Sequence, residues 1–202
     1  MRRTLPWLLV LIIAVVGCGQ SESPGEEPER ATPAEVPSEA EIVAGEPAIL
    51  ERPFTADEIR AEWVPGLRIL MRRSYPERSV VERWTVVAAD EEGVDIEYAT
   101  VSDQLEIEGE PNTKRSTWVE LRDHASFPAA TASREWINRT TLLGELDGWL
   151  YRVADDNKAT VEEYFFAASL PGVPVQMKIF DGEGVVFELE QTARLRPTTP
   201  TQ

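Results

Sequence analysis

The chain has 202 residues, and its 36 acidic and 20 basic side chains give a formal net charge of −16 at pH 7. So acidic a protein repels nucleic-acid phosphates and anionic lipid head groups, which argues against a nucleic-acid partner. The length allows one folded domain plus a tail, and the single cysteine excludes a disulfide within one chain.

The first segment, Met1–Gln20, has the features of an export signal. Two arginines precede an apolar run over Leu5–Val16, which is too short for a spanning helix of about 20 residues and suits a signal peptide. The run ends in Val15-Val16-Gly17-Cys18, which resembles the lipobox of bacterial lipoproteins. The resemblance implies a signal peptide over residues 1–17, cleavage between Gly17 and Cys18, and a lipid on Cys18.

A lipid on Cys18 would decide where the protein works. Each buried acyl methylene contributes about 0.8 kcal/mol, so two or three chains anchor a protein firmly. In Gram-negative lipoproteins an aspartate after the cysteine favours the inner membrane, and Gly19 stands in that position here. The resemblance therefore implies the cell envelope, and the outer membrane, on its periplasmic or surface side, if the organism has one. A lipidated Cys18 also leaves no thiol for catalysis or zinc binding.

Residues 18–48 are expected to form a disordered linker. From Gly19 to Ala48 the chain has eight glutamates, five prolines, one arginine and no aromatic residue. Such a segment buries too little apolar surface to offset the entropy cost of ordering it. We expect a folded domain over residues 49–196, held away from the membrane, and a polar, disordered tail over residues 197–202.

The folded part should begin with a short helix followed by strands. Thr55-Ala56-Asp57-Glu58 is a capping-box pattern, and Pro65-Gly66 follows the expected helix end at Glu62 or Trp63. Clear alternation of apolar and polar residues over Val94–Val101 predicts a strand with one buried face. Two further strands are predicted before it, at Leu67–Arg73 and Val80–Ala89.

A second capping box, Thr117-Trp118-Val119-Glu120, predicts a short helix to about His124 or Ala125. The turns beyond it contain the glycine, asparagine and aspartate residues that tight turns favour. Five strands are predicted between these turns, at Arg134–Leu142, Gly148–Val153, Thr160–Ala167, Val175–Phe180 and Val185–Leu195.

These elements predict a mainly β (α+β) fold, an antiparallel curved sheet of about eight strands with two short helices. The predicted elements lack the regular alternation of strands and helices that is typical of a parallel sheet. The aromatic residues suffice for a core between sheet and helices, or some of them could line a pocket for an apolar ligand. They are Phe54, Trp63, Trp84, Trp118, Phe127, Trp136, Trp149, Phe165, Phe166 and Phe187.

Tyr164-Phe165-Phe166-Ala167, followed by Leu170-Pro171-Gly172-Val173-Pro174-Val175, resembles a segment of exported envelope domains of unknown function. The strand-rich body from Phe54 to Arg196 is also similar to lipoprotein carriers and receptors of the Lol type. Those proteins curl an antiparallel sheet around short helices and hold acyl chains there. The resemblance implies the same for this chain but assigns no ligand-binding residue.

The sequence offers little catalytic chemistry. His124 is the sole histidine, and although Asp123 and Ser126 lie nearby, no G-x-S-x-G elbow occurs. A histidine at a helix end is also favoured by the helix dipole, and we expect His124 to be structural. Glu162 and Glu163 are neighbours on a predicted strand, so they should point to opposite faces and form no acid–base pair.

Metal and phosphate sites are not expected. Asp155-Asp156-Asn157 lacks the spacing of a calcium loop, and Gly182 and Gly184 lie in a hairpin that opens no helix. We therefore expect no metal and no cofactor. One group of arginines could bind an anion, although pairing with the protein's own glutamates is the simpler expectation. It comprises Arg68, Arg72, Arg73, Arg78 and Arg83.

The expected function is that of a non-enzymatic binding or scaffolding module, held at the membrane by the lipid on Cys18, whose partner is a protein or an apolar ligand. Two alternatives remain open. One is a lipid or lipoprotein carrier that holds acyl chains in its concave sheet, and the other is a hydrolase of unrecognised type.

Overall fold

Nine strands and two short helices make up the computed structural model, which describes residues 48–155, 160–182 and 184–197. The helices are α1 (Ala56–Glu62) and α2 (Trp118–Asp123). The strands are β1 (Arg68–Tyr75), β2 (Arg78–Ala89), β3 (Gly93–Val101), β4 (Ile107–Thr117), β5 (Ala132–Thr141), β6 (Gly144–Ala154), β7 (Val161–Ala167), β8 (Gln176–Asp181) and β9 (Gly184–Leu195).

Several predictions concern the chain outside this range. The signal peptide over residues 1–17, the lipidation and cleavage site at Gly17 and Cys18, the linker as far as residue 47 and the tail from residue 198 all lie outside the described residues. They remain predictions. Within the described residues, no helix is both long and apolar enough to cross a membrane.

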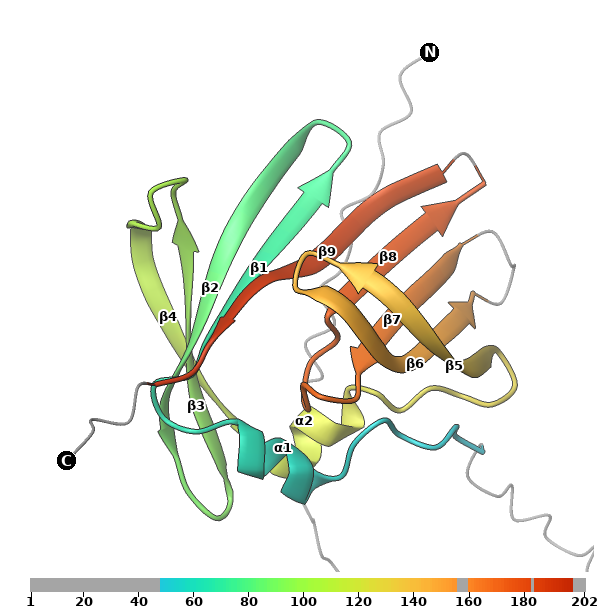
Figure 1. Cartoon of the computed structure of the whole chain (residues 1–202), viewed down its shortest axis with the longest axis horizontal. Helices are drawn as coiled ribbons and strands as arrows, with labels where there is room; N and C mark the ends of the chain where they lie inside the picture. The colour runs from blue at the N-terminus through green and yellow to red at the C-terminus, as the bar shows by residue number, and fades with distance from the viewer. Residues whose placement is uncertain (1–47, 156–159, 183, 198–202) are drawn as a thin grey trace, which may run out of the picture. The chain divides into compact units, whose positions relative to one another are not determined.

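The strands form one antiparallel sheet in the order β4-β3-β2-β1-β9-β8-β7-β6-β5. The last strand, β9, pairs with β1 and so joins two meanders, β1 to β4 and β5 to β8, into one curved sheet (Figure 1). The sheet does not close on itself: within the described residues, β4 and β5 are its two edges. The predicted mainly β fold with two short helices is confirmed.

The prediction of about eight strands missed β4, at Ile107–Thr117. Nearly every residue of this edge strand is exposed, so it has no alternation between a buried and a wet face. It also contains Gly109 and Pro111, which normally indicate a loop. Its pairing with β3 depends on backbone hydrogen bonds, which leave no side-chain pattern.

Both predicted capping boxes are present. In α1, the Thr55 side chain accepts the Glu58 N–H at 3.2 Å, and the Glu58 carboxylate accepts the Thr55 N–H at 2.7 Å. Thr117 and Glu120 make the same pair of bonds at the start of α2, at 3.1 and 2.7 Å. The caps satisfy N–H groups that the first helical turn leaves free.

Both helices pack on one face of the sheet, here called the helix face. Ile59 of α1 and Leu121 of α2 are buried against β1, β3, β6 and β7. Trp63, Trp118, Phe54, Phe127 and Phe166 fill this interface. The expectation that aromatic residues pack between the sheet and the helices is therefore confirmed for these side chains.

A second, smaller core lies on the other side of the sheet, here called the hairpin face. Leu150 and Phe165 are buried there, whereas their neighbours Tyr151 and Phe166 point to the helix face. The turn of the β5–β6 hairpin is tied to β9, because the Leu142 N–H donates to Glu190 Oε1 at 3.1 Å. The hairpin thus covers part of the face opposite the helices (Figure 1).

Candidate functional site

The three residues considered for a catalytic triad do not form one. Asp123 accepts a hydrogen bond from Arg122 Nε at 2.8 Å and lies 3.1 Å from Arg52 Nε. Ser126 Oγ accepts from Arg52 Nε at 2.9 Å. Exposed His124 follows the last residue of α2 and, within the described residues, makes no hydrogen bond to either of them. Both partners of a triad are thus held by arginine side chains.

The two neighbouring glutamates have separate partners. Glu163 is paired with Arg139 at 3.2 Å and with Arg152 at 2.8 Å, whereas Glu162 accepts a hydrogen bond from the Tyr164 hydroxyl. They form no acid–base pair.

Of the segment Asp155-Asp156-Asn157, which lacks the spacing of a calcium loop, residues 156–157 lie outside the described residues. Among the described residues, no group of three His, Cys, Asp or Glu side chains could hold a metal ion.

The group of arginines in β1 and β2 largely pairs with the protein's own glutamates, as expected. Three ion pairs occur, namely Arg72–Glu190 at 3.2 Å, Arg73–Glu82 at 3.0 Å and Arg83–Glu97 at 3.4 Å. Their charges are matched inside the sheet, so these side chains are poor candidates for binding a partner.

A different set of arginines gathers around an open cleft of about 560 Å³ beside the start of α1. We call it the arginine cleft. Arg52 comes from the segment before α1, Arg122 from α2 and Arg134 from β5. The other lining residues include Glu51, Phe54, Glu58 and Trp149.

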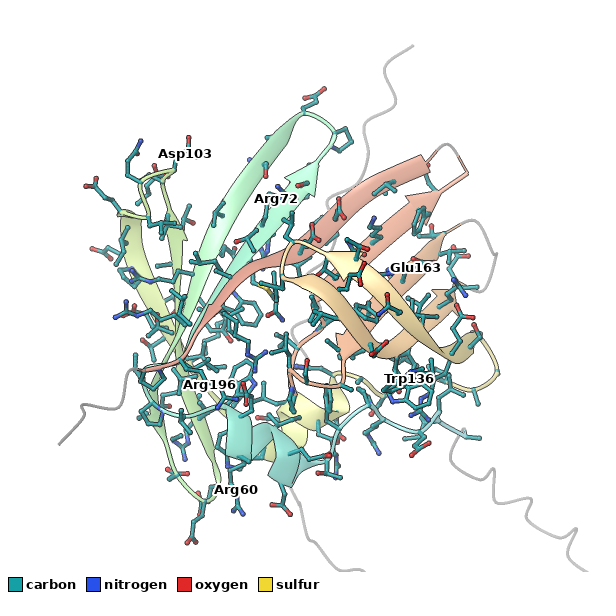
Figure 2. All side chains as sticks on the ribbon, viewed as in Figure 1. Arg60, Arg72, Asp103, Trp136, Glu163 and Arg196 are labelled. Carbon is teal, nitrogen blue, oxygen red and sulfur yellow. The ribbon has the colours of Figure 1, made fainter. Side chains whose placement is uncertain are left out.

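Arg134 forms the wall of the cleft on the sheet side. Its guanidinium lies over the Trp149 indole, 3.4 Å from the ring centroid, and it pairs with the Glu51 carboxylate. On the same sheet face, Trp136 packs edge-on against Trp149, with centroids 4.9 Å apart. Figure 2 shows Trp136 next to β5 and β6. Stacking on an indole holds a guanidinium in a fixed plane, with its edge free for further hydrogen bonds.

The segment that carries Glu51 is held against the sheet by its backbone. The Tyr151 hydroxyl donates to the Glu51 carbonyl oxygen at 2.6 Å, and burial raises the pKa of Tyr151 to about 12. The hydroxyl therefore stays protonated and remains a donor at neutral pH. Leu50 adds a backbone bond to Phe127 at 2.9 Å.

Arg52 and Arg122 form the opposite wall, and each is held by its Nε atom. Hydrogen bonding from Arg122, followed by the positive charge of Arg52, holds the pKa of the Asp123 carboxyl below its usual value despite partial burial. Asp123 thus stays ionised and orients both guanidinium groups. Within the described residues, the Nη atoms of Arg52 and Arg122 make no hydrogen bond, since the bonds of both side chains use Nε.

The cleft combines three fixed guanidinium groups, free N–H donors on Arg52 and Arg122, and an aromatic wall. A planar guanidinium edge suits a carboxylate, which accepts two parallel hydrogen bonds. Arginine and tryptophan are also enriched where protein interfaces concentrate their binding energy. The sequence did not reveal this site, because its three arginines are far apart along the chain. The arginines that stand close together in the sequence are those of β1 and β2, three of which pair with glutamates.

No family model matches the chain, and no curated protein matches it. Among solved structures, it is similar to MucB in a complex of Pseudomonas aeruginosa MucA and MucB, with 8% identity, a TM-score of 0.47, and coverage of 72% of this chain and 57% of that one. A structure of MucB alone gives 8% identity, a TM-score of 0.48 and coverage of 71% and 57%. A hypothetical protein from Chlamydia trachomatis gives 11% identity, a TM-score of 0.39 and coverage of 74% and 99%.

The chain thus spans little more than half the length of the MucB structures that it resembles.

Proposed function

We propose that the protein is a lipoprotein of the bacterial cell envelope that acts as a non-enzymatic binding module for a protein partner. The lipid on Cys18 would hold it at the membrane, and the arginine cleft would receive a carboxylate-bearing segment of the partner. The observation that carries this proposal is the pair of free guanidinium edges, those of Arg52 and Arg122, in a fixed and partly aromatic cleft.

The charge of the protein supports a specific site for this partner. With a net charge of −16, most of the surface repels an acidic segment. At the arginine cleft, Arg52, Arg122 and Arg134 balance the charges of Glu51, Glu58 and Asp123, so the excess of negative charge is absent there. An acidic segment is therefore repelled less at this cleft than elsewhere, and the Nη atoms of Arg52 and Arg122 offer it hydrogen-bond donors.

The alternative of an acyl-chain carrier has less support. Such a carrier needs apolar space inside the curved sheet. The aromatic side chains that could line it, among them Trp63, Trp118 and Phe166, are packed between the helices and the sheet. The hydrolase alternative has less support too, because Asp123 and Ser126 are engaged by arginines.

Site-specific photo-crosslinking in the native membrane tests the proposal. A benzophenone amino acid in place of exposed Glu51, at the rim of the cleft, should form an adduct with the partner, whereas one at exposed Ala61 of α1 should not. Arg122→Glu should abolish the adduct, because it places a negative charge where the carboxylate binds.

Arg60→Glu is the matched control, since it makes the same charge change on exposed α1, outside the cleft. An adduct that is lost in Arg122→Glu and kept in Arg60→Glu supports the proposal. An adduct that survives Arg122→Glu, or the lack of any adduct at position 51, contradicts it.

A further inference from the structure

The two edges of the sheet differ in how well they are protected. On β4, Pro111 removes a backbone donor, Gly109 has a φ of 80°, and pairing with β3 is interrupted between Tyr98 and Thr100. Glu108 and Glu110 add charge. These are the features with which natural proteins prevent pairing at an edge.

The β5 edge also carries charges, Arg134, Glu135 and Arg139, but it lacks the proline, the glycine and the register shift. Its sequence, ASREWINRTT, contains no glycine or proline, and it pairs with β6 over its full length, Ala132 to Thr141, without a register shift. Every second residue of an edge strand turns its N–H and C=O away from its neighbour. A long, regular edge of this kind is a template for another strand.

The same edge exposes apolar surface. Trp136 is 52% exposed, although its indole packs on Trp149. Ile137, on the hairpin face, is only partly buried against the second core. A strand placed beside β5 would cover both side chains while satisfying the free backbone groups.

We infer that a second copy of this chain is the strand that pairs with β5, antiparallel, about a two-fold axis at Ile137. In an antiparallel pair, residues directly opposite each other point to the same face. Ile137 lies midway between Glu135 and Arg139, which share its face. The axis at Ile137 therefore places Glu135 of each copy opposite Arg139 of the other, and this pairing occurs twice. It would extend the pairs that both side chains already make in their own copy, Glu135 with Arg152 at 2.6 Å and Arg139 with Glu163 at 3.2 Å.

Other two-fold registers are less favourable. An axis at Glu135, Arg134 or Arg139 would place two like charges directly opposite each other, which is destabilising. An axis at Trp136 or Asn138 would place an apolar Ile137 opposite Glu135 or Arg139. The register at Ile137 is the one in which the strand complements itself, as a symmetric interface requires.

The high net charge of each copy does not oppose this contact strongly. The β5 strand itself has two arginines and one glutamate, so repulsion at the contact is small. Charges elsewhere on the two copies are screened beyond a Debye length of about 8 Å at physiological salt. The inference is independent of the arginine cleft, because it depends on the backbone edge and on the charges of the hairpin face.

Single cysteines test the register directly. Opposite residues of antiparallel strands have Cα atoms about 4.5 to 5.5 Å apart, within the range that a disulfide bridges. Diagonal residues are about 7 to 8 Å apart, which is too far. Under mild oxidation of the full chain in detergent, Ile137→Cys should therefore give a disulfide-linked dimer on a non-reducing gel.

Trp136→Cys and Asn138→Cys are the matched controls. Each variant alone should give little disulfide-linked dimer, because position 136 faces position 138 of the other copy. A mixture of the two variants should give a disulfide-linked dimer for the same reason. The wild-type chain, with Cys18 as its sole cysteine, sets the background. Equal cross-linking of all three single variants, or none with a folded Ile137→Cys, would overturn the inference.

A charge reversal gives a second test. Glu135→Arg in the Ile137→Cys chain places a second positive charge opposite Arg139 and should reduce dimer formation at least several-fold. Glu145→Arg makes the same charge change at an exposed position of β6, away from the edge, and should leave dimer formation unchanged. If both reversals reduce the dimer equally, or neither does, the proposed register is wrong.

Discussion

Among single residues, Gly172 shows how closely the loop before β8 packs on the core. Its φ is +123°, a region that other residues avoid, and a Cβ at this position would lie 2.3 Å from Nε1 of Trp63. That indole nitrogen donates to the Pro171 carbonyl oxygen at 2.9 Å, and Arg194 Nη2 donates to the same oxygen at 3.0 Å. The glycine thus lets the loop approach the buried tryptophan.

We expect Gly172→Ala to lower the free energy of unfolding by about 3 kcal/mol, because backbone strain and overpacking each cost about 1 to 3 kcal/mol. Urea unfolding followed by tryptophan fluorescence measures the loss. Gly109 has a φ of +80°, and a Cβ added there would meet open space. Gly109→Ala should therefore lower the free energy of unfolding by less, through backbone strain alone. Equal costs for the two variants would show that the contact with Trp63 does not matter.

At the same scale, the function of the arginines depends on their neighbours in space. Arg72 and Arg73 stand close together in the sequence, and each meets a glutamate of an adjacent strand. Arg52 and Arg122 share Asp123 and keep their Nη atoms free within the described residues. The sequence shows which side chains are charged but cannot show which charges are already paired.

Among the elements, the two helices are short and depend on their caps. Hydrogen bonds from the Thr55 backbone and side chain hold the pKa of Glu58 below its ordinary value of 4.5, and Thr117 does the same for Glu120. A carboxyl whose pKa is lower in the folded state adds stability above its unfolded pKa. That stability is lost as the pH falls through the folded pKa.

The Glu58→Gln/Glu120→Gln variant should therefore be less stable than the wild type at pH 7, and the difference should shrink below about pH 4.5. Thr55→Ala and Thr117→Ala should each cost about 1 kcal/mol at pH 7. Urea unfolding at pH 7 and at about pH 3.5 measures both effects. A difference that does not change with pH would mean that the carboxylate charge of the caps contributes nothing.

The elements also differ in how clearly their sequences predict them. A strand such as β3, with Val94 and Ile96 buried and Asp95 and Glu97 more exposed, has an alternation that predicts it. The capping boxes predict both helices, because they join residues three apart. Strand β4 has neither signal, since its pairing depends on the backbone of β3 and its side chains are nearly all exposed.

For the whole molecule, the main prediction concerns the proposed anchor, which lies outside the described residues. Cys18→Ser should leave an uncleaved or mislocalised precursor without lipid, because serine provides no thiol for the thioether. Labelling with palmitate, followed by membrane fractionation, measures this. Gly19→Asp should stay lipidated, but in a Gram-negative host it should move to the inner membrane. A Cys18→Ser chain that is still processed and still membrane-bound would refute the anchor.

The sequence by itself determined the class of the fold, because alternation and capping act between residues close along the chain. It predicted eight of the nine described strands and both helices. Tertiary structure alone decided that β9 pairs with β1, that β5 lies at an edge of the sheet, and that Arg52, Arg122 and Arg134 meet at one cleft. The physical reason is that these features depend on backbone pairing and on charges far apart in the sequence, which leave no local pattern.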